Sequence, residues 1–227
     1  MESDKPDLRH RKLDYQECWA KILLERYFPE EYSNLELSDR PDLLDKLHHI
    51  GIEVTNAVPE KEQRAISLAS RIPYDQEKIK QKNLALLDKE DYKYTDYGLF
   101  HPSQSWSWNN RDRLDFSCTP YQLLFDIVRK KVALLNSKNY KNYPRYDLYV
   151  RSELFIMNDF LPDIIEELFA INVGARSYTM IYLLTLEDIV CFDMVQKTYR
   201  CVEIKGKLND IGPLAMKMVE GAENDKT

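Results

Sequence analysis

Two side-chain periods alternate along this chain of 227 residues: the two-residue period of β-strands and the 3.6-residue period of α-helices. The order is helix, strands, helices, strand, helix, strands, with a weaker helical pattern at the end. That order predicts a mixed α/β fold, a single domain with one central mixed sheet flanked by helices. The expected helices span 15–27, 59–71, 75–89, 120–136 and 159–170, and the expected strands span 34–38, 41–45, 50–55, 146–152, 177–184, 189–195 and 198–204.

Three segments fall outside this pattern. Residues 1–12 predict a flexible polar arm, and residues 221–227 predict a polar tail. Residues 58–118 predict an inserted region of helices and a long loop, because the part after residue 90 has no sustained period. Trp106 and Trp108 in that loop are candidates for stacking on bases or seating a partner, or else they pin the loop to the core.

Composition narrows the classes of function. A net charge of −6 and a pI of about 5.4 argue against coating nucleic acid through bulk charge, but they leave room for a local basic groove and bound metal. The four cysteines form no Cys-x-x-Cys pair, so a zinc site of the usual spacing is not expected. The absence of a secretory signal or a long apolar run predicts a cytoplasmic protein that does not enter a membrane. No phosphate-binding loop, dinucleotide fingerprint or serine-hydrolase elbow is present in the sequence.

The run IGIEVT at 50–55 places a carboxylate inside an apolar strand. Residues at even positions share one face, and Gly51, Glu53 and Thr55 share the other. If 41–45 and 50–55 form a hairpin, Asp42 lies near Glu53, and the two acids raise each other's pKa unless a cation lies between them. Such oxygen ligands suit Mg²⁺ or Mn²⁺.

A second interpretation of the same residues needs no metal. Asp42 follows a proline, as turn residues often do. Glu53 would then lie on the solvent face of an edge strand and pair with Lys46.

The stretch RPDLLDKLHHIGIEVTNA, residues 40–57, resembles the metal-binding core of the PD-(D/E)XK restriction-endonuclease-like superfamily. The family core is a helix, about three strands, a helix and a further strand, and this order extends the resemblance loosely to about residue 155. The resemblance implies a Mg²⁺- or Mn²⁺-dependent nuclease acting on DNA, with Asp42 and Glu53 as metal ligands. It also implies a third acid, Glu25, on the first helix, with Gln63 as a weaker candidate.

Position 55 is Thr where the family pattern has Lys. Some members are thought to supply the lysine from the helix after the hairpin, and Lys130 and Lys131 are the candidates to position water or stabilise the transition state. Their alternative role is a favourable charge near a helix C-terminus. If no lysine reaches Glu53, the chain is expected to be a catalytically inactive nuclease-like fold that acts as a protein-interaction or accessory module. The sequence does not specify the oligomeric state.

A second hairpin carries a competing pattern. Asp193, Glu203 and Lys205 include a Glu-x-Lys ten residues after an Asp, and Gln196–Lys197 is expected to be a two-residue loop. No proline precedes Asp193, and few residues remain for the helix and strand that should follow. Cross-strand ion pairs are the alternative role of these residues. The sequence therefore favours Asp42 and Glu53.

Overall fold

The computed structural model describes residues 13–57, 64–65, 68, 72, 76–89, 93–95, 98–100, 119–137, 140–152, 156, 158–185, 187–204 and 207–224. The chain divides into two compact units, one of residues 1–57 and 120–227 and the other of residues 58–119. The second unit corresponds, within one residue, to the segment expected as an insertion. In the described ranges, no helix is long and apolar enough to cross a membrane.

The first unit contains a seven-stranded mixed sheet in the order β1-β2-β3-β6-β7-β8-β9. Strands β3, β6 and β7 run parallel, and the other neighbours run antiparallel. The predicted mixed α/β class is confirmed. The elements are α1 (Tyr15–Tyr27), β1 (Leu35–Leu37), β2 (Leu43–Asp45), β3 (Ile50–Ala57), α4 (Thr119–Leu135), β6 (Arg145–Ser152), η2 (Asn158–Phe160), α5 (Leu161–Ile171), β7 (Met180–Leu184), β8 (Asp188–Asp193), β9 (Thr198–Glu203) and α6 (Ile211–Asn224).

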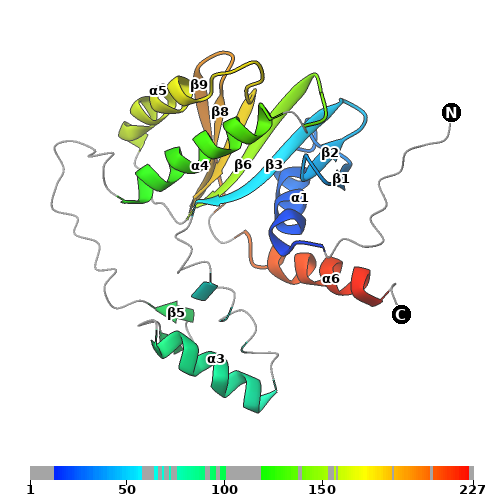
Figure 1. Ribbon diagram of the computed structural model, residues 1–227, viewed down its shortest axis with the longest axis vertical. Helices are drawn as coiled ribbons and strands as arrows, with labels where there is room; N and C mark the ends of the chain where they lie inside the picture. Colours follow the sequence, from blue (N-terminus) through cyan, green and yellow to red (C-terminus); the bar gives the residue numbers. More distant parts are fainter. Residues whose placement is uncertain are drawn as a thin grey trace. The chain divides into compact units, whose positions relative to one another are not determined.

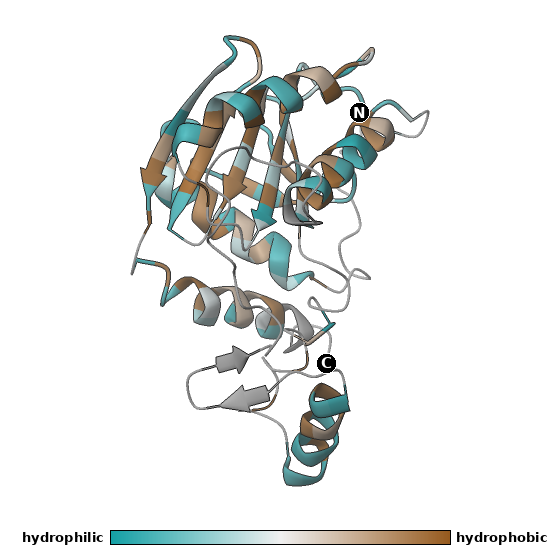
Figure 2. Cartoon of the chain, turned by 90° about the vertical axis from the view of Figure 1, so that its left-hand side faces the viewer, coloured by the Kyte–Doolittle hydropathy of each residue, from teal (hydrophilic) through white to brown (hydrophobic). Residues whose placement is uncertain are grey.

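Helices cover both faces of this sheet. Parallel neighbours need crossover connections, and the helices α4 and α5 precede the parallel strands β6 and β7 (Figure 1). These two helices lie on one face, while α1 and α6 lie on the other (Figure 1). Since both faces are covered, apolar residues run through the central strands, and Figure 2 shows brown segments on the sheet beside teal ones.

The alternation predicted for β3 is observed. Ile50, Ile52 and Val54 pack into the core shared with α1 and α6. The intervening residues therefore face the layer of α4 and α5. Helix α1 begins where its sequence predicts, because the Asp14 carboxylate accepts hydrogen bonds from the N–H groups of Gln16 (2.7 Å) and Glu17 (3.4 Å).

The second unit has its own small core, in which Ala65, Ile72 and Leu87 are buried together. It contains α3 (Glu77–Lys89) and an antiparallel pair, β4 (Lys93–Thr95) and β5 (Gly98–Phe100). The expectation of an irregular segment from residue 90 onward is therefore wrong at this short hairpin. Trp106, Trp108, Gln63 and most of the helix expected at 59–71 lie outside the described residues.

Several boundaries in the first unit differ from expectation, among them the β8–β9 turn and the end of the last helix. The β8–β9 turn has four residues, 194–197, rather than two, because the Asp193 carboxylate accepts the N–H groups of Val195 (2.9 Å) and Gln196 (2.8 Å). Helix α6 continues through Asn224, so it includes part of the predicted tail at 221–227. The predicted arm at 1–12 lies outside the described residues.

Candidate active site

The β2–β3 hairpin brings the two predicted acids to one place. Its strands pair antiparallel around a turn at 46–49, as the sequence predicted, with Leu43 opposite Ile52. Asp42 directly precedes β2, and its Oδ2 accepts a hydrogen bond of 2.8 Å from the backbone N–H of Val54. That bond fixes Asp42 beside the residue that follows Glu53.

Gly51 allows the chain to pack closely at this point. A Cβ atom at Gly51 would lie 2.8 Å from Cγ of Pro41 and 3.3 Å from Cδ1 of Tyr146. Any larger residue would push Pro41, and with it Asp42, away from β3. The Pro41 ring therefore packs closely against Gly51, two residues before Glu53.

Glu53 lies in a central strand, not at an edge. Strand β3 pairs with both β2 and β6, and Glu53 is 5% exposed. Lys46, the partner expected if Glu53 faced solvent, instead forms an ion pair with Glu36. The solvent-exposed alternative for Glu53 is therefore wrong.

Lys131 is the lysine that reaches the two acids. It extends from α4, and its Nζ lies 2.6 Å from Oε2 of Glu53 and 3.6 Å from Oδ2 of Asp42. The adjacent Lys130 is exposed. Tyr178, which the sequence did not single out, donates a hydrogen bond of 3.2 Å to the backbone carbonyl of Lys131 and so holds this turn of α4 over the sheet.

The electrostatics of Glu53 reflect its burial. Desolvation raises the pKa of the Glu53 carboxyl, the negative charge of Asp42 raises it further, and the ammonium of Lys131 acts in the opposite direction. Burial also raises the pKa of Tyr178, with Glu53 and Asp42 adding to the effect. A buried acid pair of this kind needs a cation, and Lys131 supplies one.

The structure does not bring Glu25 to this pair. Its Oε1 accepts hydrogen bonds from Lys21 Nζ (2.5 Å) and from the N–H of Leu35 (2.7 Å), which ties α1 to β1. Helix α1 covers the opposite face of the sheet from α4 (Figure 1). The assisting role expected for Glu25 is therefore not supported, and the residue holds the fold together.

The competing hairpin does not assemble a site either. In the β8–β9 register, Asp193 is opposite Thr198, whereas Glu203 is opposite Asp188. Five positions along a strand correspond to about 17 Å, so Asp193 and Glu203 lie at opposite ends of the hairpin. Lys205 lies outside the described residues.

The acid pair suits a small divalent cation. Mg²⁺ is usually bound through one or two protein carboxylates, while waters and substrate phosphates complete the octahedron. In the part of the chain that the structure describes, no group of three or more His, Cys, Asp or Glu is arranged to hold a metal. Asp42 and Glu53 fit the two-carboxylate type. The ammonium of Lys131 lies next to both carboxylates, which shows that a positive charge fits at this position.

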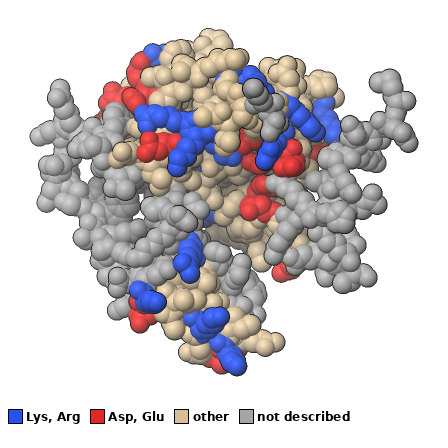
Figure 3. All heavy atoms as spheres, in the orientation of Figure 1, with Lys and Arg blue, Asp and Glu red and all other residues tan. Residues whose placement is uncertain are grey.

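The surface over α4 carries both signs of charge (Figure 3). Arg129 on this helix is already paired with Asp126 (2.7 Å) and Glu167 (3.3 Å). Lys130 adds an exposed positive charge next to Lys131. This face is therefore mixed in charge, on a chain whose net charge is −6.

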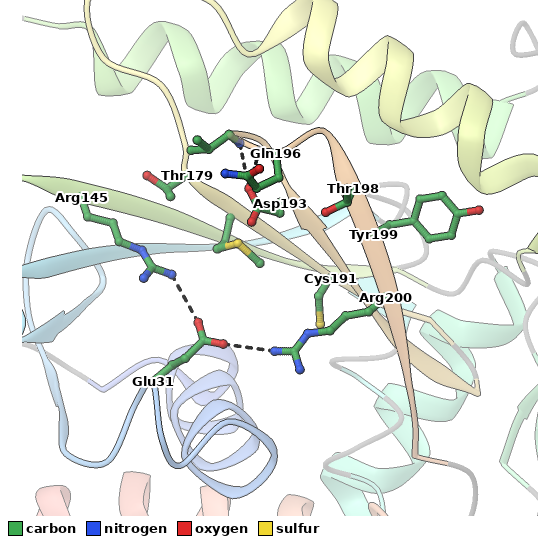
Figure 4. A pocket seen from close by; sticks show the side chains of 11 residues that line it. Glu31, Arg145, Thr179, Cys191, Asp193, Gln196, Thr198, Tyr199 and Arg200 are labelled. Atoms are coloured by element: carbon green, nitrogen blue, oxygen red, sulfur yellow. Dashed lines mark hydrogen bonds and ion pairs between the residues drawn. The ribbon is translucent and has the colours of Figure 1, made fainter.

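A second polar cluster lies on the opposite face and was not predicted. Asp147 is completely buried and is held by Arg145, by the hydroxyl of Tyr32 (2.6 Å) and by the N–H of Met180 (3.0 Å). Beside it, Arg145 and Arg200 point toward Glu31 from opposite sides of a cavity of about 470 Å³ (Figure 4). Asp193 also lines this cavity, so its lining carries two arginines and two carboxylates.

Comparison of the chain with protein-family models, with curated proteins and with solved structures finds no match.

Proposed function

We propose that the chain is a Mg²⁺- or Mn²⁺-dependent phosphodiesterase that acts on DNA, with its active site at Asp42, Glu53 and Lys131. One observation carries the proposal: a single ammonium, from α4, reaches two carboxylates that the β2–β3 hairpin holds in a mostly buried position. The order α1, β1–β3, α4, β6 in the first unit is also the order that the family resemblance implies.

Energetics favour a functional role for this arrangement. Removing ionised side chains from water costs several kcal/mol per ion, and an apolar replacement of a buried ion pair is often neutral or stabilising. Glu53 and Lys131 have side chains that are only 7% and 17% exposed. Buried ionisable groups with perturbed pKa values cluster at catalytic sites, and the Glu53–Lys131 pair fits that pattern.

Each residue has a distinct role in the proposed reaction. Asp42 and Glu53 would hold the metal ion, which when bound lowers the pKa of water and stabilises charge on the phosphate. Lys131 would donate a hydrogen bond to the attacking water or to a phosphate oxygen. Tyr178 would keep the helix backbone at Lys131 in place. DNA as the substrate comes from the resemblance alone.

Cleavage of DNA in the presence of Mn²⁺ tests the proposal. Asp42→Asn, Glu53→Gln and Lys131→Met are each expected to lower the rate by at least about 100-fold. Lys130→Met, one residue away on the exposed side of α4, and Glu203→Gln, on the competing hairpin, are matched controls that should retain the rate. Circular dichroism on every variant separates lost chemistry from lost folding.

The alternative is a catalytically inactive nuclease-like fold that acts through protein contacts. Thr55, at the place where the family pattern has lysine, favours it. If the wild-type chain neither cleaves DNA nor binds Mn²⁺ in calorimetry, the enzyme proposal is wrong and this alternative remains.

A further inference from the structure

The position of Lys131 suggests how the metal site is controlled. We propose that Lys131 is a built-in cation that competes with the divalent metal for Asp42 and Glu53, so that the metal binds only when the ammonium withdraws. This inference rests on the proposed function and concerns the regulation of the same site.

Lys131 lies close to both of the carboxylates that would hold the metal. Nζ of Lys131 lies 2.6 Å from Oε2 of Glu53 and 3.6 Å from Oδ2 of Asp42. A Mg²⁺ ion bound to the same carboxylates would lie about 2.0–2.1 Å from their oxygens. Both cations would then share one small region, where their repulsion is strong because little water screens it.

The three charged side chains are largely shielded from solvent. The side chains of Asp42, Glu53 and Lys131 are 20%, 7% and 17% exposed. Solvent ions therefore screen this site less than they screen a surface pair. The ammonium neutralises part of the acid charge before any metal arrives, so it lowers the attraction that the site offers to a metal.

The helix backbone at Lys131 is held in place, whereas the lysine side chain can move. Tyr178 holds the backbone carbonyl of Lys131, whereas the four-carbon stem of the lysine can change rotamer without moving the helix. A substrate phosphate would offer the displaced ammonium a new partner of opposite charge. Metal and substrate are then expected to favour each other's binding, since each relieves the competition that Lys131 imposes.

Direct measurement of Mn²⁺ binding tests the inference without relying on activity. Free Mn²⁺ is followed by electron paramagnetic resonance during titration of the full chain, at one pH and one salt concentration. Lys131→Met should bind Mn²⁺ at least about tenfold more tightly than wild type, because a like charge beside the metal is removed. Lys131→Arg, which keeps the charge, and Lys130→Met should not tighten binding.

A second variant and a second measurement guard against a folding defect. Lys131→Gln removes the charge but keeps a hydrogen-bond donor for Glu53, and it should tighten binding as Lys131→Met does. The Tm increase produced by Mn²⁺ should be larger in both neutral variants than in wild type.

The outcomes separate this inference from the proposed function. If wild type binds Mn²⁺ at Asp42 and Glu53 but the neutral variants bind it equally or more weakly, competition by Lys131 is wrong and the metal site stands. If neither wild type nor the neutral variants bind Mn²⁺, both proposals are wrong.

Discussion

The ammonium of Lys131 lies 2.6 Å from Oε2 of Glu53, although the two residues are 78 positions apart in the chain. The second unit of the chain, residues 58–119, lies between them in sequence. The β2–β3 hairpin presents the carboxylate and α4 presents the ammonium. The candidate site therefore depends on the packing of α4 against the sheet.

The acid pair makes a specific prediction for titration. The negative charge of Asp42 helps to raise the pKa of Glu53, so Asp42→Asn should lower that pKa. Carboxyl ¹³C chemical shifts of Glu53, followed by NMR as a function of pH, measure the change. An unchanged or higher Glu53 pKa in the variant would show that the two acids do not interact.

Glu53 should also affect the pH dependence of stability. Its pKa in the folded chain is raised above the ordinary value of 4.5. The contribution of Glu53 to stability is thus fully present below its unfolded pKa and is lost as pH rises through its folded pKa. The free energy of unfolding of wild type, minus that of Glu53→Gln, should fall as pH rises through this window, as measured by urea unfolding at a series of pH values.

Gly51 should be indispensable for the geometry of the site. Gly51→Ala places a Cβ atom 2.8 Å from Cγ of Pro41, and Pro41 must move together with Asp42. We expect a loss of about 1–3 kcal/mol in the free energy of unfolding, as for other overpacked sites, and weaker Mn²⁺ binding. Gly221→Ala is the matched control, because nothing lies within 4 Å of its Cβ position in α6.

The control should move in the opposite direction. Alanine is favoured over glycine in a helix by about 1 kcal/mol, so Gly221→Ala should be neutral or stabilising. Equal effects of the two substitutions on unfolding and on Mn²⁺ binding would contradict the role given to Gly51.

Much of this architecture could be predicted from side-chain periodicity. The helix expected at 15–27 is observed as Tyr15–Tyr27, and the helix expected at 120–136 is observed as Thr119–Leu135. These segments are long, and their apolar residues are buried against the sheet, so local pattern and final packing agree.

Helical periodicity also distinguishes Lys131 from Lys130. Lys131 follows the buried Val128 by three residues and the buried Leu124 by seven, which places it on the inward stripe of α4. Lys130 follows Val128 by two residues and lies outside that stripe. Helical geometry therefore selects the lysine that the structure brings to Glu53.

The buried Asp147 network was beyond sequence reasoning. The expected strand at 146–152 was assigned one apolar side, and Asp147 falls on the other. Both faces of β6 are covered, which depends on the placement of α1 and α4 rather than on the strand itself. Arg145, Tyr32 and Asp147 meet only through that tertiary arrangement.

The second hairpin should be dispensable for metal binding. The register places Asp193 and Glu203 at opposite ends of β8 and β9, too far apart to share an ion. Glu203→Gln should leave the Mn²⁺ affinity within about twofold of wild type, since its charge lies far from Glu53 on the strand order. A large loss of affinity in this variant would transfer the site to the second hairpin.

Of the substitutions considered, removal of Arg145 should cause the largest loss in the free energy of unfolding. Burial raises the pKa of the completely buried Asp147, and Arg145 opposes that shift through an ion pair of 2.9 Å. Arg145→Met leaves this carboxylate without its cation, which costs about 3–5 kcal/mol in similar buried pairs. Because the variant raises the Asp147 pKa further, the deficit should grow as pH rises through that pKa.

Arg200→Met is the control. The Arg200 side chain is 58% exposed and pairs with Glu31, so a loss of at most about 1 kcal/mol in the free energy of unfolding is expected. Urea unfolding of both variants at low and neutral pH measures the two losses, and a deficit in Arg145→Met no larger than that in Arg200→Met would show that Asp147 does not depend on its ion pair.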